Sequence, residues 1–183
     1  MILFINACAR KESRTKKIAD CFLSTETGPV TEVRLFEMSF PVFDESFLAG
    51  RDRLIAERRF DDDAFFLARQ FSSADKIVVA APLWDLSFPA SVKQYFEQIN
   101  VPGVTFFYTP EGVPESLCRA KSLTYITSVG GDFFPEEFGF GYIKALAENF
   151  YGIKDVRLIK ATGLDLDGAD ADAIVDSVCK GML

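Results

Sequence analysis

The stretch Ile77-Val78-Val79-Ala80-Ala81-Pro82-Leu83-Trp84 decides the fold. Its first five residues are apolar and uninterrupted, which is the pattern of a strand buried on both faces. Such strands belong to parallel sheets, because the crossover helices of a parallel sheet cover both of its faces. The strand leads into a proline and the only tryptophan of the chain, so we expect an aromatic loop to follow it.

Predicted strands and helices alternate on both sides of this stretch. Further strands are expected at residues 2–5, 30–36, 122–127 and 156–161, and helices at 13–24, 61–72, 89–100, 141–151 and 169–179, with an arginine-rich candidate at 51–59. This alternation predicts an α/β protein with right-handed crossovers. The arrangement that fits best is a flavodoxin-like three-layer sandwich, a five-stranded parallel sheet of order 2-1-3-4-5 with helices on both faces. We expect residues 1–183 to form a single domain.

The composition excludes several classes of function. The net charge of the chain is −7, and an acidic protein repels nucleic-acid backbones and anionic membrane surfaces. The chain has no histidine, which excludes histidine-based catalytic triads and histidine-ligated zinc. We therefore predict no nucleic-acid partner, no membrane partner and no metal site. The chemistry must depend on other side chains or on a cofactor.

The cysteines indicate a reducing environment. Cys8, Cys21, Cys118 and Cys179 are widely spaced and form no C-x-x-C pair. We expect four reduced, buried thiols in a cytoplasmic protein. The sequence shows no signal-peptide pattern after Met1 and no apolar stretch of membrane-spanning length, which agrees with that expectation.

Polar groups follow the first predicted strand, where a helix begins. Hydroxyls, cations and the free N–H groups of a helix start suit a phosphate monoester, and the candidates are Arg10, Ser13, Arg14 and Thr15. The alternative is that Ser13 only caps the helix and the basic residues belong to a solvated turn. No G-x-x-x-x-G-K or G-x-G-x-x-G motif occurs here, so pyrophosphate binding of the dinucleotide type is not expected.

Two more strand ends meet at the same edge of the predicted sheet. The loop after the third strand offers an apolar surface and a polar edge for a flat ring, through Pro82, Leu83, Trp84, Asp85 and Leu86. The alternative is that Trp84 is a core or interface aromatic. The fourth strand ends in Thr127, Ser128, Gly130 and Gly131, where paired glycines allow backbone N–H groups to approach a ligand, although a plain turn would explain them equally well. Together the three strand ends describe a site for a flat heterocycle with a monophosphate.

Four motifs, in the order in which they occur along the chain, resemble those of the FMN-dependent NADH-azoreductase and NAD(P)H–quinone oxidoreductase group of flavodoxin-like proteins. They are Ala9-Arg10-x-x-Ser13-Arg14-Thr15, Pro82-Leu83-Trp84-Asp85-Leu86, the segment 103–108 and Thr127-Ser128-x-Gly130-Gly131. The resemblance implies FMN with its phosphate at Arg10 and residues 13–15, its ring on residues 82–86, and backbone amides of Gly130 and Gly131 toward the ring. It also implies a homodimer that transfers two electrons by a ping-pong mechanism from NADH or NADPH to quinones or azo compounds. Phe106 and Tyr108 are the candidates for the apolar wall of the substrate pocket, and we name no catalytic side chain because the flavin supplies the redox chemistry.

Two departures from the group concern ligand contacts. Cys8-Ala9-Arg10 stands where members often have Ser-Pro-Arg, and Asp85 stands where they often have asparagine. We expect the Asp85 carboxylate to accept a hydrogen bond at the polar edge of the ring and to oppose negative charge there. The alternative is that Asp85 only caps the following turn and faces solvent. The alternative functions are a flavodoxin-type electron carrier that serves a protein partner and a cofactor-free regulatory module. A signalling receiver domain is disfavoured, because Asn6-Ala7 and Pro82-Leu83 occupy the positions where it needs acidic residues.

Overall fold

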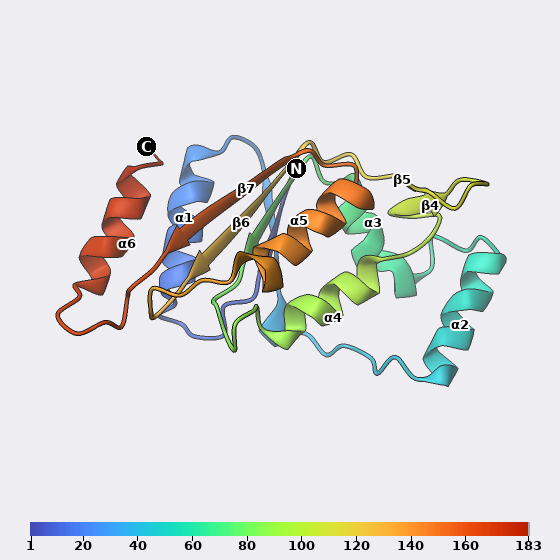
Figure 1. Cartoon of the computed structure of the whole chain (residues 1–183). Helices are drawn as coiled ribbons and strands as arrows, with labels where there is room; N and C mark the ends of the chain where they lie inside the picture. The colour runs from blue at the N-terminus through green and yellow to red at the C-terminus, as the bar shows by residue number, and fades with distance from the viewer. Residues whose placement is uncertain (183) are drawn as a thin grey trace.

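The central strand of the sheet is β3 (Lys76–Ala80), and it pairs with β1 (Ile2–Asn6) on one side and β6 (Ser122–Ser128) on the other. In the computed structural model, which describes residues 1–182, β2 (Val30–Arg34) and β7 (Asp155–Ala161) lie at the two edges. All four pairings are parallel, so the predicted order 2-1-3-4-5 is confirmed (Figure 1). The carboxyl ends of the strands therefore meet at one edge.

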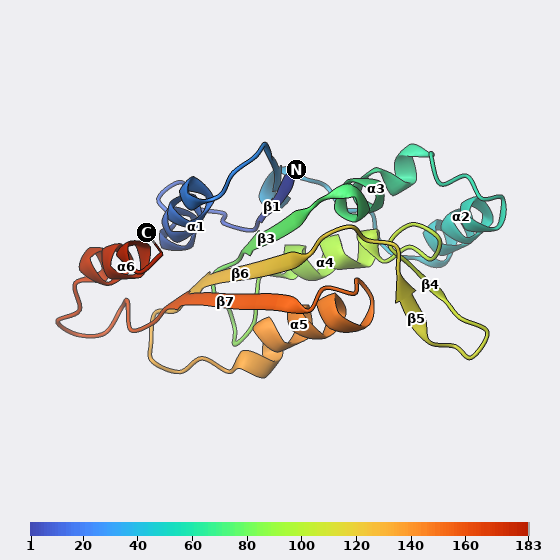
Figure 2. The ribbon, with the colours of Figure 1, turned by 90° about the horizontal axis from the view of Figure 1, so that it is seen from above.

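Helices cover both faces of the sheet, as the view from above shows (Figure 2). Helices α1 (Arg14–Thr25) and α6 (Ala171–Lys180) share one core with one face. Helices α3 (Phe66–Ser73), α4 (Ala90–Ile99) and α5 (Phe140–Asn149) share the larger core on the opposite face. The predicted three-layer architecture is thus confirmed.

The position of β3 between two layers of helices explains why its sequence is an unbroken apolar run. Ile77 and Val79 belong to the core under α3, α4 and α5, whereas Val78 and Ala80 belong to the core under α1 and α6. All four side chains are almost completely buried. A strand with helices on both faces has no solvent face, so polar alternation is absent.

Local hydrogen bonds move several predicted boundaries. The second strand ends at Arg34, because the chain turns into a 3₁₀ helix over Leu35–Glu37. The helix expected at 61–72 begins later, at Phe66, after a 3₁₀ turn over Asp63–Phe65 in which Asp62 accepts from the N–H of Ala64.

Helix α2 and a β-hairpin lie outside the three layers. The arginine-rich candidate at 51–59 proves to be α2 (Glu45–Ala56), which starts earlier because the Asp44 carboxylate accepts from Phe47 N–H at 2.8 Å. The β-hairpin is the antiparallel pair β4 (Phe106–Tyr108) and β5 (Pro114–Ser116), which is absent from the predicted strands. Within residues 1–182, no helix is long and apolar enough to cross a membrane.

A disulfide joins α1 to α6, so the expectation of four reduced thiols is wrong for one pair. Cys21 and Cys179 are separated by 158 positions, but the two helices lie side by side and bring their Cα atoms to 5.6 Å. Cys8 and Cys118 are free and half-buried. Spacing in the sequence could not reveal the pair, because it depends on how the first and last helices pack on one face of the sheet.

We expect this disulfide to stabilise the fold by roughly 2–4 kcal/mol, because it constrains the unfolded chain. Reduction should therefore lower the urea midpoint of unfolding, measured by circular dichroism. Thiol titration of the denatured but unreduced protein should count two free thiols, those of Cys8 and Cys118.

The double variant Cys21→Ser with Cys179→Ser provides the control. Its midpoint should match that of the reduced protein and should no longer respond to reductant, while Cys118→Ser should keep the response. Four reactive thiols in the unreduced protein, or a midpoint unaffected by reduction, would contradict the assignment.

Candidate functional site

A cleft of about 430 Å³ opens at the carboxyl ends of the strands. Four segments line it: the loop after β1 with the start of α1, the loop after β3, the end of β6 and the loop after β7. The lining residues are Ala9, Arg10, Glu12, Ser13, Arg14, Thr15, Pro82, Leu83, Trp84, Ser128, Gly130, Leu164 and Asp165. Of the predicted site residues, the structure brings nine to this cleft: Arg10, Ser13, Arg14, Thr15, Pro82, Leu83, Trp84, Ser128 and Gly130.

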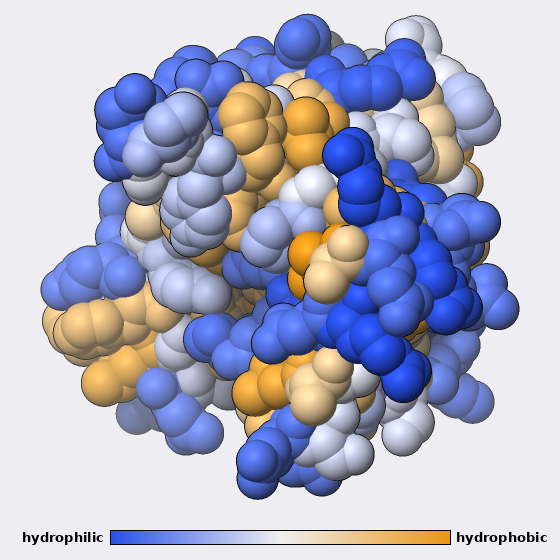
Figure 3. Space-filling view, turned by 90° about the vertical axis from the view of Figure 1, so that its right-hand side faces the viewer, coloured by the Kyte–Doolittle hydropathy of each residue, from blue (hydrophilic) through white to orange (hydrophobic). Residues whose placement is uncertain are grey.

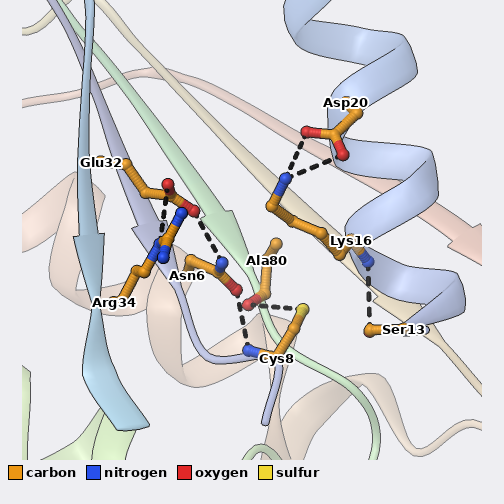
Figure 4. Close-up of polar contacts among 8 residues, drawn as sticks. All are labelled: Asn6, Cys8, Ser13, Lys16, Asp20, Glu32, Arg34 and Ala80. Carbon is orange, nitrogen blue, oxygen red and sulfur yellow. Dashed lines mark hydrogen bonds and ion pairs between the residues drawn. The ribbon is translucent and has the colours of Figure 1, made fainter. Parts of the chain in front are cut away.

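Asn6 fixes the first turn of the loop after β1 (Figure 4). Its side-chain oxygen accepts from the N–H of Cys8 at 2.9 Å, and its amide nitrogen donates to Glu32 on β2 at 2.8 Å. Burial opposes ionisation of Glu32, but the hydrogen bonds from Asn6 and Arg34 outweigh it and lower the pKa of this carboxyl. Glu32 is therefore a charged acceptor at neutral pH, which holds the Asn6 amide in place.

Cys8 is a free thiol in this loop, and its surroundings favour the protonated form. Burial raises the pKa of Cys8, with the hydrogen bond to Ser13 as the main opposing effect. Its sulfur lies 3.8 Å from the carbonyl oxygen of Ala80 on β3 (Figure 4). A protonated thiol is a poor nucleophile. The contact with Ala80 shows that Cys8 packs the loop against β3.

The start of α1 presents donors to the cleft. Ser13 is the N-cap, and its hydroxyl accepts from the N–H of Lys16 at 3.2 Å. The first N–H groups of a helix have no intrahelical acceptor, so they favour an anion. Lys16 does not line the cleft and is bound to the carboxylate of Asp20 at 2.6 and 2.8 Å, so Arg10 and Arg14 are the cations that line the cleft. Ser13 therefore caps the helix, as the alternative expected, and it also lines the cleft.

Thr15 ties α1 to the end of β6. Its side chain is completely buried, and its hydroxyl lies 2.6 Å from the hydroxyl of Ser128. The backbone of Ser128 also accepts from the N–H of Leu83 at 3.1 Å. The three predicted loops are therefore joined to one another by hydrogen bonds before any ligand is considered.

The loop after β3 contains a tight and strained turn. Trp84 and Ser87 exchange both backbone hydrogen bonds, at 2.8 and 2.9 Å, around Asp85 and Leu86. These two residues have φ of 48° and 70°, a left-handed conformation that normally selects asparagine or glycine. Such strain is characteristic of functional sites, where the surrounding structure enforces it. The turn leaves the Trp84 side chain 39% exposed, in contact with the ring of Phe36 at 5.8 Å.

Four predicted residues lie next to the cleft but do not line it. Asp85 and Leu86 form the exposed tip of the turn, and Asp85 lines a neighbouring groove of about 750 Å³ together with Phe36 and Phe88. The structure therefore does not place the Asp85 carboxylate at the cleft wall. Thr127 is completely buried, and Gly131 does not belong to the lining.

Gly130 makes room for a protein side chain, whereas we expected it to make room for a ligand. A Cβ added at Gly130 would lie 2.5 Å from a carboxylate oxygen of Asp165. The N–H of Asp165 donates to the carbonyl of Gly130 at 2.8 Å, and that of Gly163 to the carbonyl of Gly131 at 2.8 Å. The other oxygen of Asp165 forms an ion pair with Arg14 at 2.6 Å.

Asp165 is absent from the predicted site residues, because those residues come from the ends of only three strands. The fifth strand, β7, ends at Ala161 on the same edge of the sheet, and Asp165 follows four positions later. Buried Leu164 anchors this loop and also lines the cleft. The sequence signal that could have found Asp165 is an acidic residue shortly after the fifth predicted strand, whose end lies at the same edge of the sheet.

Phe106 and Tyr108 are not brought to the cleft. They lie on the β4–β5 hairpin, beyond the amino ends of the sheet strands, while the cleft is at the carboxyl ends (Figure 2). Phe106 is buried against Phe150 at 4.8 Å, and Tyr108 is exposed. Within one chain, neither side chain lines the cleft. The hairpin directly precedes β6 in the chain, so it lies at the end of the sheet where β6 begins, whereas the cleft lies where β6 ends.

Comparison with known proteins agrees with this geometry. The model of the flavodoxin-like fold family matches residues 1–180. A Clostridium perfringens protein named FMN-dependent NADH:quinone oxidoreductase is 35% identical, with 96% of this chain and 92% of that protein covered. A Lachnoclostridium phytofermentans protein of the same name is 37% identical, with 95% and 91% covered.

Solved structures share the fold at lower sequence identity. An azoreductase from Bacillus anthracis superimposes with a TM-score of 0.83 at 24% identity, over 99% of this chain and 95% of that chain. An FMN-dependent NADH-azoreductase from the same species, solved in complex with FMN, gives a TM-score of 0.78 at 22% identity, over 99% and 94%. The chain belongs to the flavodoxin-like fold family, in the group of FMN-dependent NADH:quinone oxidoreductases.

Proposed function

We propose that this protein is an FMN-dependent oxidoreductase that passes two electrons from NADH or NADPH to quinones, azo compounds or similar aromatic acceptors. The observation that carries the proposal is the cleft at the carboxyl ends of β1, β3 and β6, which is lined by two arginines and a helix start as well as by the aromatic ring of Trp84. Relatives that are 35% and 37% identical over nearly the whole chain bear the name FMN-dependent NADH:quinone oxidoreductase, which supports the same activity here.

The chemistry of the donor set fits FMN. Two guanidinium groups and the N–H groups of a helix start suit its phosphate, and Arg10, Ser13, Arg14 and Thr15 would hold it. Pro82, Leu83 and Trp84 offer an apolar surface for the ring. The cleft volume of about 430 Å³ lies within the range that is usual for cofactor sites.

Bound FMN would accept electrons from a nicotinamide dinucleotide and deliver them to the aromatic acceptor. The residues of the chain bind and orient the participants. The hydrogen bonds from Thr15 and Leu83 to Ser128 fix the loops relative to one another, so the site is preorganised. The strained turn at Asp85 and Leu86 holds the Trp84 ring at the mouth of the cleft.

We also propose that the protein acts as a homodimer. The face formed by α2 and the β4–β5 hairpin carries exposed apolar side chains among polar ones (Figure 3). Helix α2 buries none of its residues within one chain, and Leu48, Phe107, Tyr108 and Val113 are exposed. Apolar surface of this kind is characteristic of protein–protein contacts. Tyr108 lies away from the cleft of its own chain, so it would contact a substrate only in the cleft of a partner subunit.

The absorbance spectrum of the purified protein tests the cofactor. We expect flavin bands near ~375 and ~450 nm, and NADH oxidation that depends on added quinone. A colourless protein that shows no quinone-dependent NADH oxidation after incubation with FMN would contradict the proposed function.

Arg14→Ala tests the phosphate site. Loss of a charge-assisted hydrogen bond should weaken FMN binding by roughly 1.5–3 kcal/mol, measured by quenching of flavin fluorescence. Riboflavin, which lacks the phosphate, should bind equally to both proteins. Lys11→Ala is the matched control, because Lys11 is an exposed basic residue of the same loop that does not line the cleft. Equal FMN affinity of the Arg14 variant and the natural protein would contradict this assignment.

Sedimentation tests the dimer. We expect a dimer at micromolar concentration, and Leu48→Glu should shift it toward the monomer, because a buried unpaired charge opposes association. Glu57→Gln, an exposed change just after the same helix, serves as the control. A fully active monomer would contradict the proposal.

A further inference from the structure

Asp165 and Arg14 form an ion pair in the wall of the cleft. The Nη1 atom of Arg14 lies 2.6 Å from Oδ1 of Asp165, and both side chains line the cleft. Arg14 opens α1, whereas Asp165 follows β7, so the ion pair joins two separate segments of the wall. Neither residue has another ion pair among residues 1–182.

The position of Asp165 is determined by its own backbone. Its N–H donates to Gly130 at 2.8 Å, and the preceding residue, Leu164, is buried. Its second carboxylate oxygen lies 2.5 Å from the place that a Cβ of Gly130 would take. The carboxylate therefore lies in a space that the glycine leaves open, and it belongs to the construction of the cleft.

The charged side chains of the cleft balance without a ligand. Arg10 and Arg14 contribute two positive charges, and Glu12 and Asp165 contribute two negative charges. A phosphate monoester carries nearly two negative charges at neutral pH and needs cations with free donors. One of the two cations that line the cleft already donates to a carboxylate.

We propose that Asp165 is an internal competitor for the phosphate site and thereby sets the affinity of the cleft for its phosphorylated ligand. The carboxylate holds Arg14 when no phosphate is bound, and an entering phosphate monoester displaces it. The inference rests on the proposed function for the identity of the ligand as FMN. The competition for Arg14 applies to any phosphate monoester.

Asp165→Asn removes the competing charge and keeps the size of the side chain. An exposed ion pair contributes about 0.2–1 kcal/mol, so FMN should bind roughly 1.4- to fivefold more tightly to the variant. The measurement is flavin fluorescence quenching with the full-length protein freed of flavin. Riboflavin has the same ring and ribityl chain without the phosphate, and it should bind the variant and the natural protein equally.

Asp167→Asn is the matched control. It removes the same charge from the same loop, and Asp167 is exposed and forms no ion pair within residues 1–182. Its FMN affinity should remain that of the natural protein. Unchanged or weaker FMN binding by the Asp165 variant would overturn the inference. Equal tightening of riboflavin would overturn it as well, because the carboxylate would then act on the ring or the ribityl chain.

A second measurement separates this inference from the proposed function. If the natural protein fails to bind FMN, the proposed function fails, and inorganic phosphate remains as the probe. Phosphate, compared with chloride at equal ionic strength, should raise the melting temperature of Asp165→Asn more than that of the natural protein. Equal shifts in the two proteins would overturn the competition between Asp165 and phosphate for Arg14.

Discussion

The parallel alignment of β3 with its two neighbours is the constraint on which the rest of the structure depends. Because β1, β3 and β6 run in the same direction, their carboxyl ends meet at one edge. The chain leaves β1 into α1 on one face and leaves β3 into α4 on the other face. The two loops therefore diverge between adjacent strands, and a crevice follows from the topology. The sheet creates the cleft, and the side chains only determine what the cleft binds.

Hydrogen bonds between loops give that crevice a fixed shape. Thr15 and Leu83 both bond to Ser128, so segments from three strands converge on one residue. Separate hydrogen bonds of Asn6 with Cys8 and Glu32 tie the loop after β1 to the edge strand β2. A ligand that enters meets groups that are already ordered, so binding costs little further conformational entropy in the protein. The left-handed pair at Asp85 and Leu86 is strained, and it lies where the aromatic ring is presented.

Sequence patterns predicted the features that arise from short-range physics. The apolar runs gave the five strands and their order, and Ser13 was recognised at the start of a helix. Three features depended on contacts between distant segments, and the sequence did not reveal them. Asp165 reaches the cleft because Gly130 leaves space for it, and Cys21 meets Cys179 because the first and last helices share one face. Phe106 and Tyr108 do not reach the cleft of their own chain, because a hairpin absent from the predicted elements carries them beyond the opposite ends of the strands.

The disulfide between α1 and α6 makes most of the polypeptide a covalent ring. It closes across 158 positions, so β2, α2, the hairpin and every cleft loop after the start of α1 lie inside the ring. A protease that cuts once inside the ring leaves one molecule of unchanged mass apart from an added water. The two pieces separate on a gel only after reduction. A single proteolytic nick between Cys21 and Cys179 is therefore invisible to non-reducing electrophoresis, and the cleft can survive a broken backbone.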